Sequence, residues 1–209
     1  MTPINTDATR AHWDDVHSRF PEAQVSWFEP VPRRSLDWVA ESAVVSNAPI
    51  IDIGGGASTL VDELIARGFT DVTVLDISGK VLTKVESRLG ERMRFVALVA
   101  GDVTLFEPRR TYALWHDRAV FHFLIDEAER RRYRETLLGA THVGSHVVIS
   151  TFGPEGPTRC SGLVTARYDA IQLAAELGPS FELQRSSVDM HTTPAGTQQQ
   201  FLHAHFIRR

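Results

Sequence analysis

The sequence contains little cysteine and no long apolar run. Cys160 is the only cysteine among 209 residues, which excludes an intrachain disulfide framework and is typical of a protein in a reducing compartment. No apolar stretch approaches the length of a membrane span, and residues 1–10 lack the basic flank and apolar centre of a signal peptide. These absences predict a cytoplasmic protein with no membrane partner.

Neither sign of charge is in large excess, because 22 basic residues stand against 26 acidic ones and give a net charge of −4. This slight acidity argues against a general nucleic-acid surface. No internal repeat, low-complexity segment or linker divides the chain, and its length suits one domain with a substantial core. We therefore expect a single domain, in which residues 1–48 form a helical lid segment ahead of a main part at 49–209.

Three consecutive glycines at 54–56 are the most informative feature of the sequence. They follow the Ile-rich run 50–53, which is interrupted only by Asp52, and they lead into a helical apolar pattern that starts at Leu60. This order predicts a strand, a tight turn and a helix start. In α/β sheets, such a turn is where an adenosine-bearing cofactor binds.

The spacing of the glycines argues against two nucleotide classes. A dinucleotide fingerprint needs glycines at the first, third and sixth positions, but the sixth position counted from Gly54 is Thr59. No Gly-Lys-Ser/Thr follows, so a triphosphate loop is also disfavoured. Asp52 would repel phosphate and suits an ammonium group. A nucleotide without phosphates, held by its sugar and an amino-acid tail, fits best.

Two further acids follow the next two predicted strands. Asp76 ends the apolar run 72–75 and lies about 20 residues beyond the glycine turn, where a carboxylate accepts hydrogen bonds from ribose hydroxyls. Gly101 and Asp102 follow the third strand. Gly-Asp is also a common turn sequence, which is the structural alternative for Asp102.

Strand and helix patterns alternate along most of the chain. We expect a Rossmann-like α/β fold, with a mostly parallel sheet of seven strands, helices on both faces and a C-terminal antiparallel strand pair. The expected helices are 8–19, 33–46, 60–67, 78–89, 126–139 and 168–177, and the expected strands are 50–53, 72–75, 93–98, 112–117, 143–152, 181–190 and 198–207, with a Pro- and Gly-rich loop at 154–162.

Residues 52–58 resemble motif I of the class I S-adenosyl-L-methionine-dependent methyltransferases, an acid followed by alternating glycines, with Ser58 in place of the last glycine. Asp76 and Asp102 stand where this family holds ribose and adenine. The resemblance covers residues 49–209. More weakly, the segments around Trp13 and Trp27 resemble bacterial relatives of methyltransferases that modify lysine in elongation factors or citrate synthase.

The resemblance implies S-adenosyl-L-methionine as the cofactor of a methyltransferase domain at 49–209. Asp52 and the glycines would hold its methionine part, Asp76 its ribose, and Asp102 with Val103 its adenine. The full expected cofactor set is Asp52, Gly54, Gly55, Gly56, Asp76, Ile77, Gly101, Asp102, Val103 and Asp117.

The same resemblance places the fourth strand, which ends at Asp117, beside the transferred methyl group. Asp117, Arg118 and His122 are the catalytic candidates, and Trp27, Tyr168 and His191 are candidate acceptor contacts. His122 or Asp117 would take a proton from a neutral amine or hydroxyl, whereas a thiolate or carboxylate would need no base. We expect a small-molecule acceptor. The alternatives are a protein lysine, a non-catalytic cofactor-binding protein and a nicotinamide-dependent oxidoreductase.

Simpler structural roles are available for several of these residues. Tryptophans of the N-terminal segment can serve only to pack it onto the sheet, and His122 can be a packed core residue. Cys160 and three histidines, His191, His203 and His205, are chemically sufficient for zinc, but no tight ligand spacing occurs and no metal is predicted. The hydrolase motif Gly-x-Ser-x-Gly is absent.

Overall fold

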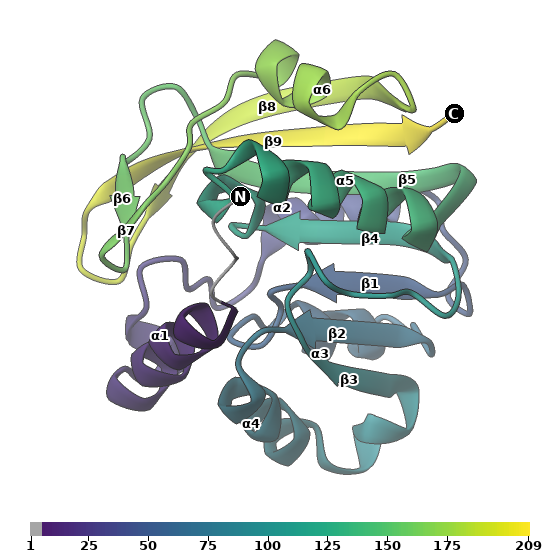
Figure 1. Ribbon diagram of the computed structural model, residues 1–209. Helices are drawn as coiled ribbons and strands as arrows, with labels where there is room; N and C mark the ends of the chain where they lie inside the picture. The colour runs from purple at the N-terminus through teal and green to yellow at the C-terminus, as the bar shows by residue number, and fades with distance from the viewer. Residues whose placement is uncertain (1–5) are drawn as a thin grey trace.

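The computed structural model describes residues 6–209, and one sheet of seven strands forms its centre (Figure 1). The strand order is β3-β2-β1-β4-β5-β9-β8. Neighbours from β3 to β5 pair in parallel, whereas β9 runs antiparallel to both β5 and β8. The strands are β1 (Ile50–Ile53), β2 (Val72–Asp76), β3 (Val96–Ala100), β4 (Tyr112–Arg118), β5 (Thr141–Phe152), β8 (Phe181–Thr192) and β9 (Gln198–Arg208). The predicted Rossmann-like sheet with its closing antiparallel pair is confirmed.

Helices cover both faces of the sheet, with α5 and α6 in front of it in Figure 1 and α2 and α3 behind it. The helices are α1 (Thr6–Arg19), α2 (Arg33–Glu41), α3 (Leu60–Ala66), α4 (Gly79–Leu89), α5 (Glu127–Ala140) and α6 (Ala170–Leu177). Within residues 6–209, no helix is long and apolar enough to cross a membrane.

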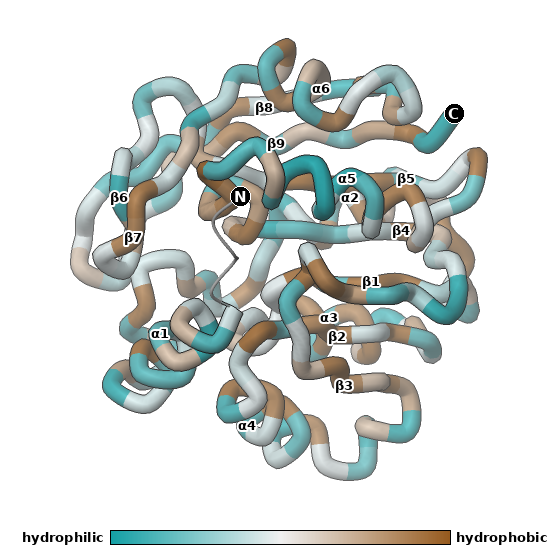
Figure 2. Tube along the Cα trace, in the orientation of Figure 1, coloured by the Kyte–Doolittle hydropathy of each residue, from teal (hydrophilic) through white to brown (hydrophobic). Residues whose placement is uncertain are grey.

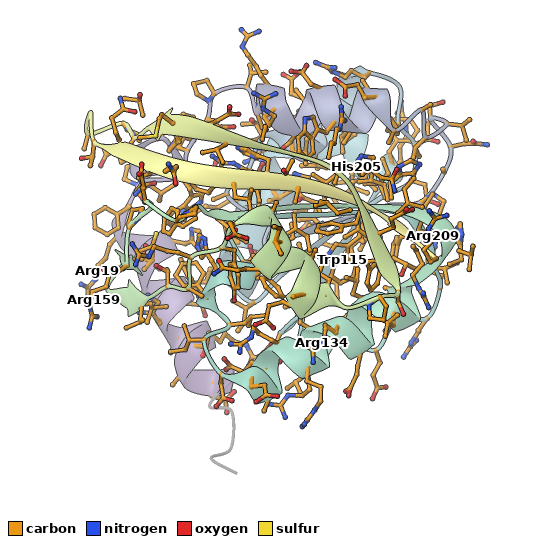
Figure 3. The ribbon with its side chains drawn as sticks, turned by 90° about the horizontal axis from the view of Figure 1, so that it is seen from above. Arg19, Trp115, Arg134, Arg159, His205 and Arg209 are labelled. Carbon is orange, nitrogen blue, oxygen red and sulfur yellow. The ribbon has the colours of Figure 1, made fainter. Side chains whose placement is uncertain are left out.

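Two apolar clusters hold these layers together, because successive side chains of a strand point to opposite faces. Ile51 and Ile53 pack with α5 and α6 in one cluster, while Ile50 packs with α2, α3 and α4 in the other. Figure 2 shows hydrophobic residues along β1 and β3 and a largely hydrophilic α5. Trp115 lies in the interior in Figure 3 and donates its indole N–H to the Tyr133 hydroxyl at 2.9 Å.

Three local expectations were wrong. Helix α2 ends at Glu41 instead of 46, because Ala43 adopts a positive φ of 54° that no helix continues through. The strand expected at 93–98 starts only at Val96, since residues Gly90–Phe95 form a 3₁₀ helix after Gly90 turns the chain. The loop at 154–162 contains half of a small hairpin, in which β6 (Arg159–Cys160) pairs with β7 (Leu163–Val164).

Candidate functional site

A cavity of about 550 Å³ opens at the carboxyl ends of β1, β2 and β4. In an open α/β sheet this edge is where ligands bind. Nine of the predicted site residues line the cavity: Trp27, Gly54, Asp76, Ile77, Gly101, Asp102, Val103, Arg118 and His122. Six others do not: Asp52, Gly55, Gly56, Asp117, Tyr168 and His191.

The glycine turn between β1 and α3 has no room for side chains. A Cβ on Gly54, whose φ is +66°, would lie 2.2 Å from Cγ2 of Val120. A Cβ on Gly55 would lie 2.2 Å from Oδ2 of Asp52. Glycine is therefore required for steric reasons at both positions, and the backbone there is bare toward the cavity.

Asp52 is 2% exposed and is fixed by a buried chain of polar groups. Its Oδ1 lies 2.7 Å from Nδ1 of His116 on β4, and Nε2 of His116 lies 2.8 Å from Oγ of Ser35 on α2. The groups Ser35, His116 and Asp52 are linked in the same order as a hydrolase triad. Ser35 is only 3% exposed and does not line the cavity, so it cannot act as a nucleophile there. We infer that these hydrogen bonds position Asp52. Oδ2 of Asp52 is buried without a hydrogen-bond partner. An orphaned buried oxygen of this kind suits an ammonium ligand.

Asp76 is 6% exposed at the end of β2 and lines the cavity. Its Oδ2 accepts the N–H of Gly56 at 3.1 Å, and its Oδ1 accepts the N–H of Ser78 at 2.9 Å. Burial raises the pKa of Asp76 to about 6, and these two backbone donors partly oppose that rise. Each oxygen retains a lone pair for a further donor.

Asp102 makes the turn contacts that were the alternative to a binding role. Its Oδ1 accepts both the N–H and the hydroxyl of Thr104 at 2.8 Å, and its Oδ2 accepts the hydroxyl of Thr6 at 3.1 Å. The second contact joins α1 to the cavity wall. Asp102 remains at the cavity with its neighbours Gly101 and Val103, so its role toward adenine stays a prediction.

Asp117 is fully buried behind the cavity wall. Its Oδ1 accepts the N–H groups of Val120 and Phe121 at 3.0 and 3.4 Å, and its Oδ2 accepts the Tyr133 hydroxyl at 2.7 Å. Burial raises its pKa to about 6. These contacts fix the turn after β4, and the predicted catalytic and cofactor roles of Asp117 find no support in this geometry.

Arg118 lines the cavity, and both of its terminal guanidinium nitrogens donate to the N-terminal segment. It donates to the carbonyl oxygen of Trp27 at 2.7 Å and to Oε1 of Glu29 at 2.8 Å. Its guanidinium carbon lies 5.0 Å from the ring centroid of Phe201. Arg118 therefore holds Trp27 in the cavity wall.

His122 is fully buried and lines the cavity from the short 3₁₀ helix Phe121–Phe123. Its Nδ1 accepts the N–H of Phe152 at 3.1 Å, so the ring hydrogen is on Nε2, which has no partner. Burial, with a smaller contribution from the Arg118 charge, lowers the pKa of His122 to about 3. His122 can thus donate a hydrogen bond, but its only lone pair is engaged, which disfavours the predicted role as a base.

Two predicted acceptor contacts lie elsewhere. Tyr168 packs against Phe121, with ring centroids 5.6 Å apart. His191 lines a second cavity of about 810 Å³, where its Nε2 lies 2.8 Å from the carbonyl oxygen of Ser26. Arg118 lines both cavities.

Sequence reasoning missed much of the cavity wall. Four side chains from α1, β5, β6 and β9 take part: Trp13, Phe152, Cys160 and Phe201. The sequence offered some indication of Trp13, because the segment around it resembles relatives of lysine methyltransferases. It offered none of the β6–β7 hairpin, because strands of two residues are too short to show a hydrophobic periodicity. Among the described residues, no group of three or more His, Cys, Asp or Glu side chains could hold a metal ion. His203 and His205 instead lie 2.8 and 2.9 Å from Ser150 and His146.

Buried histidines predict that the protein is destabilised by acid. Burial lowers the pKa of His17, His203 and His205 from 6.5 to about 4, and that of His122 to about 3. Between these values and 6.5, the unfolded chain binds protons that the native state does not bind, so stability falls as pH falls through this range. The pKa values of Asp76 and Asp117 are raised to about 6, so these two carboxyls stabilise the native state as pH falls below 6. There are only two of them, and their pKa shifts are smaller than those of the four histidines.

We expect the melting temperature to drop by about 10 °C or more between pH 7 and pH 4.5, as followed by circular dichroism. His205→Gln should flatten this decline, whereas replacing His142, which is exposed, should leave it unchanged. A melting temperature that is constant or rises toward pH 4.5 would contradict the assignment of neutral buried histidines.

No protein-family model matches the chain. EEF1A lysine methyltransferase 2 of Mus musculus is 31% identical over 78 residues, which are 34% of this chain and 32% of that protein. The human protein of the same name matches over 78 residues at the same identity. The match thus spans about a third of these curated relatives.

Solved structures match over nearly the whole chain. An S-adenosylmethionine-dependent methyltransferase from Anabaena variabilis has a TM-score of 0.75 at 17% identity, covering 99% of this chain and 96% of that one. The glycopeptide N-methyltransferase MtfA, in complex with S-adenosyl-L-methionine, has a TM-score of 0.67 at 16% identity, covering 88% and 97%. Together with the strand order and the cavity at the carboxyl edge, these likenesses show that the chain has the fold of the class I S-adenosylmethionine-dependent methyltransferases.

Proposed function

We propose that the chain is an S-adenosyl-L-methionine-dependent methyltransferase that acts on a small molecule. The observation that carries the proposal is the orphaned Oδ2 of Asp52 beside a bare glycine turn, with Asp76 and Asp102 at the next two strand ends. An ammonium group, a ribose diol and an adenine amino group are the donors that these three carboxylates would accept.

The residues present fit this cofactor. Asp52, which lies behind the cavity wall formed by Ile53 and Gly54, would take the ammonium group through its unpaired Oδ2. Asp76 would take the ribose hydroxyls, and Asp102 with Gly101, Ile77 and Val103 would enclose the adenine. When bound, S-adenosyl-L-methionine supplies an electrophilic methyl group on a positively charged sulfur. The protein's own contribution is to orient an acceptor and to exclude water, for which the aromatic wall around His122 is suited.

The N-terminal segment supports its predicted role as a lid. Thr6 of α1 donates to Asp102, and Ser78 after β2 donates to Asp14 of α1. Trp27 is held against the cavity by Arg118. Residues 6–48 would therefore cover the cavity on the side where Asp76 and Asp102 lie.

A protein lysine is the second candidate acceptor. The match to EEF1A lysine methyltransferase 2 favours it, although it covers only about a third of that protein. The apolar, aromatic wall of the cavity favours a small molecule.

Calorimetric titration with S-adenosylhomocysteine and with NAD tests the cofactor. We expect S-adenosylhomocysteine to bind and NAD not to bind; binding of NAD alone would overturn the proposal in favour of an oxidoreductase. The protein is then incubated with methyl-labelled S-adenosylmethionine and either a small-molecule extract or a lysine peptide panel. Label in the small-molecule fraction is the expected result. Label in peptides would select the second candidate, and tight binding without any transfer would indicate a non-catalytic binding protein.

A further inference from the structure

The cavity has two chemically different halves. Its carboxylates Asp76, Asp102 and Glu129 stand on the side of β2, β3 and α5, where the nucleoside is proposed to bind. The other half is walled by aromatic rings from five separate segments of the chain: Trp13, Trp27, Phe123, Phe152 and Phe201. No carboxylate lines this aromatic half in the described part of the chain.

The rings of the aromatic half pack on one another as a continuous wall. Trp13 meets Trp27 and Phe123 edge to face, with centroids 5.7 and 5.1 Å apart. Phe152 stacks on His122 at 4.3 Å and meets Phe201 at 5.0 Å. Such a wall presents apolar surface, which favours an apolar or aromatic occupant.

The ring of His122 contributes a polar donor without a partner to this wall. Nδ1 of His17 and Oε1 of Gln199, whose residues also line the cavity, are likewise buried without a hydrogen-bond partner. Nε2 of His122 carries the ring hydrogen, because Nδ1 accepts the N–H of Phe152. Nε2 is buried and makes no hydrogen bond. An unpaired buried donor is costly, and in native proteins such groups commonly await a ligand or water. The tautomer is fixed by a backbone group, so Nε2 can only donate.

A positively charged occupant is disfavoured here. The Arg118 guanidinium lies against Phe201, and its charge reaches far enough to help lower the pKa of both His122 and His203. Glu29, which forms an ion pair with Arg118, already accepts a hydrogen bond from it at 2.8 Å. A lysine ammonium would meet this positive field without a carboxylate of its own, despite the general attraction of cations to aromatic faces.

We propose that the aromatic half is the acceptor subsite and that it takes an uncharged, largely apolar molecule of aromatic width, which offers a lone-pair oxygen or nitrogen to the Nε2–H of His122. The inference rests on the proposed methyltransferase function. It selects neutral small acceptors over lysine side chains. His122 acts as a positioning donor in this site.

Three probes of similar size test the subsite: acetophenone, ethylbenzene and benzylamine. Acetophenone has a ring and a carbonyl acceptor, ethylbenzene lacks the acceptor, and benzylamine is cationic at pH 7.5. Each is titrated into ¹⁵N-labelled protein, with and without S-adenosylhomocysteine, while the indole N–H signals are followed. Signals of Trp13 and Trp27 should shift, whereas Trp115, whose N–H bonds to Tyr133, should not.

We expect acetophenone to bind at least threefold more tightly than either other probe. A smaller preference, a preference for benzylamine, or no shift of Trp13 and Trp27 with any probe would overturn the inference. His122→Phe should reduce the preference over ethylbenzene below twofold, whereas His142→Phe, at an exposed histidine that does not line the cavity, should keep it. If His122→Phe does not fold, the comparison of probes on the unmodified protein still decides.

Failure of this inference is distinguishable from failure of the proposed function. If S-adenosylhomocysteine does not bind in the calorimeter, the methyltransferase proposal fails, whatever the probes do. If S-adenosylhomocysteine binds but acetophenone has no preference, only the assignment of the acceptor subsite fails.

Discussion

Replacing Asp76 with alanine is expected to weaken S-adenosylhomocysteine binding by about 1.5–3 kcal/mol, which is roughly a tenfold to 150-fold loss of affinity. The carboxylate lies at the cavity wall with a lone pair free on each oxygen, and charge-assisted hydrogen bonds to a diol are among the stronger ones. Calorimetric titration measures the change directly.

A matched control separates this effect from the general loss of a carboxylate. Asp71 lies just before β2, at the opposite end of the strand, and forms a surface ion pair with Arg110. Asp71→Ala should leave the affinity for S-adenosylhomocysteine unchanged. An affinity that is equally unchanged in Asp76→Ala would refute the ribose role.

The raised pKa of Asp76 adds a pH dependence to the same experiment. Because its pKa is about 6, the carboxylate is increasingly protonated below pH 6, and a protonated carboxyl accepts fewer hydrogen bonds. Affinity should therefore decline by up to about tenfold per pH unit below 6. Asp76→Asn, which cannot titrate, should bind weakly at every pH without this slope.

The gathering of the proposed cofactor residues at one edge of the sheet could be predicted, because their positions follow directly from chain order. A strand that ends at Asp76 must deliver it to the carboxyl edge of a parallel sheet, where the glycine turn also lies. The same local logic identified the helix after Ser78, whose hydroxyl accepts the N–H of Val81. Short-range rules were sufficient for these elements.

Contacts that depend on register could not be predicted. His116 meets Asp52 because β1 and β4 pair in parallel with these two residues as register partners, 64 positions apart. A shift by one residue would have turned His116 to the other face of the sheet. The sequence therefore identified Asp52 but not the histidine that orients it.

Apart from Trp27, the aromatic half was not predicted, for a similar reason. Trp13, Phe152 and Phe201 come from the N-terminal helix, the fifth strand and the last strand, and only the finished sheet brings them to one wall. For Asp117, the structure shows contacts that the sequence did not predict. The end of a strand predicted a reactive acid, but both oxygens are used by Tyr133 and the backbone of the following turn.

Gly54→Ala is expected to cost about 2–5 kcal/mol of unfolding free energy and to abolish measurable binding of S-adenosylhomocysteine. Two separate penalties combine. The φ of +66° costs an alanine roughly 1–2 kcal/mol, and the new Cβ would lie 2.2 Å from Cγ2 of Val120, an overpacking that typically costs about 1–3 kcal/mol. Relief of the clash would move the turn that faces the cofactor. Urea unfolding and calorimetric titration measure the two consequences.

A double variant separates the two penalties. Val120→Ala removes the clashing methyl groups, so Gly54→Ala combined with Val120→Ala should recover part of the loss in stability relative to Val120→Ala alone, while the cost of the positive φ remains. Gly79→Ala is the control, because nothing lies within 4 Å of its Cβ and it opens α4 with an ordinary backbone. If the free energy of unfolding of Gly54→Ala lies within about 0.5 kcal/mol of that of the unmodified protein, the turn is not as rigid as the proposed cofactor site requires.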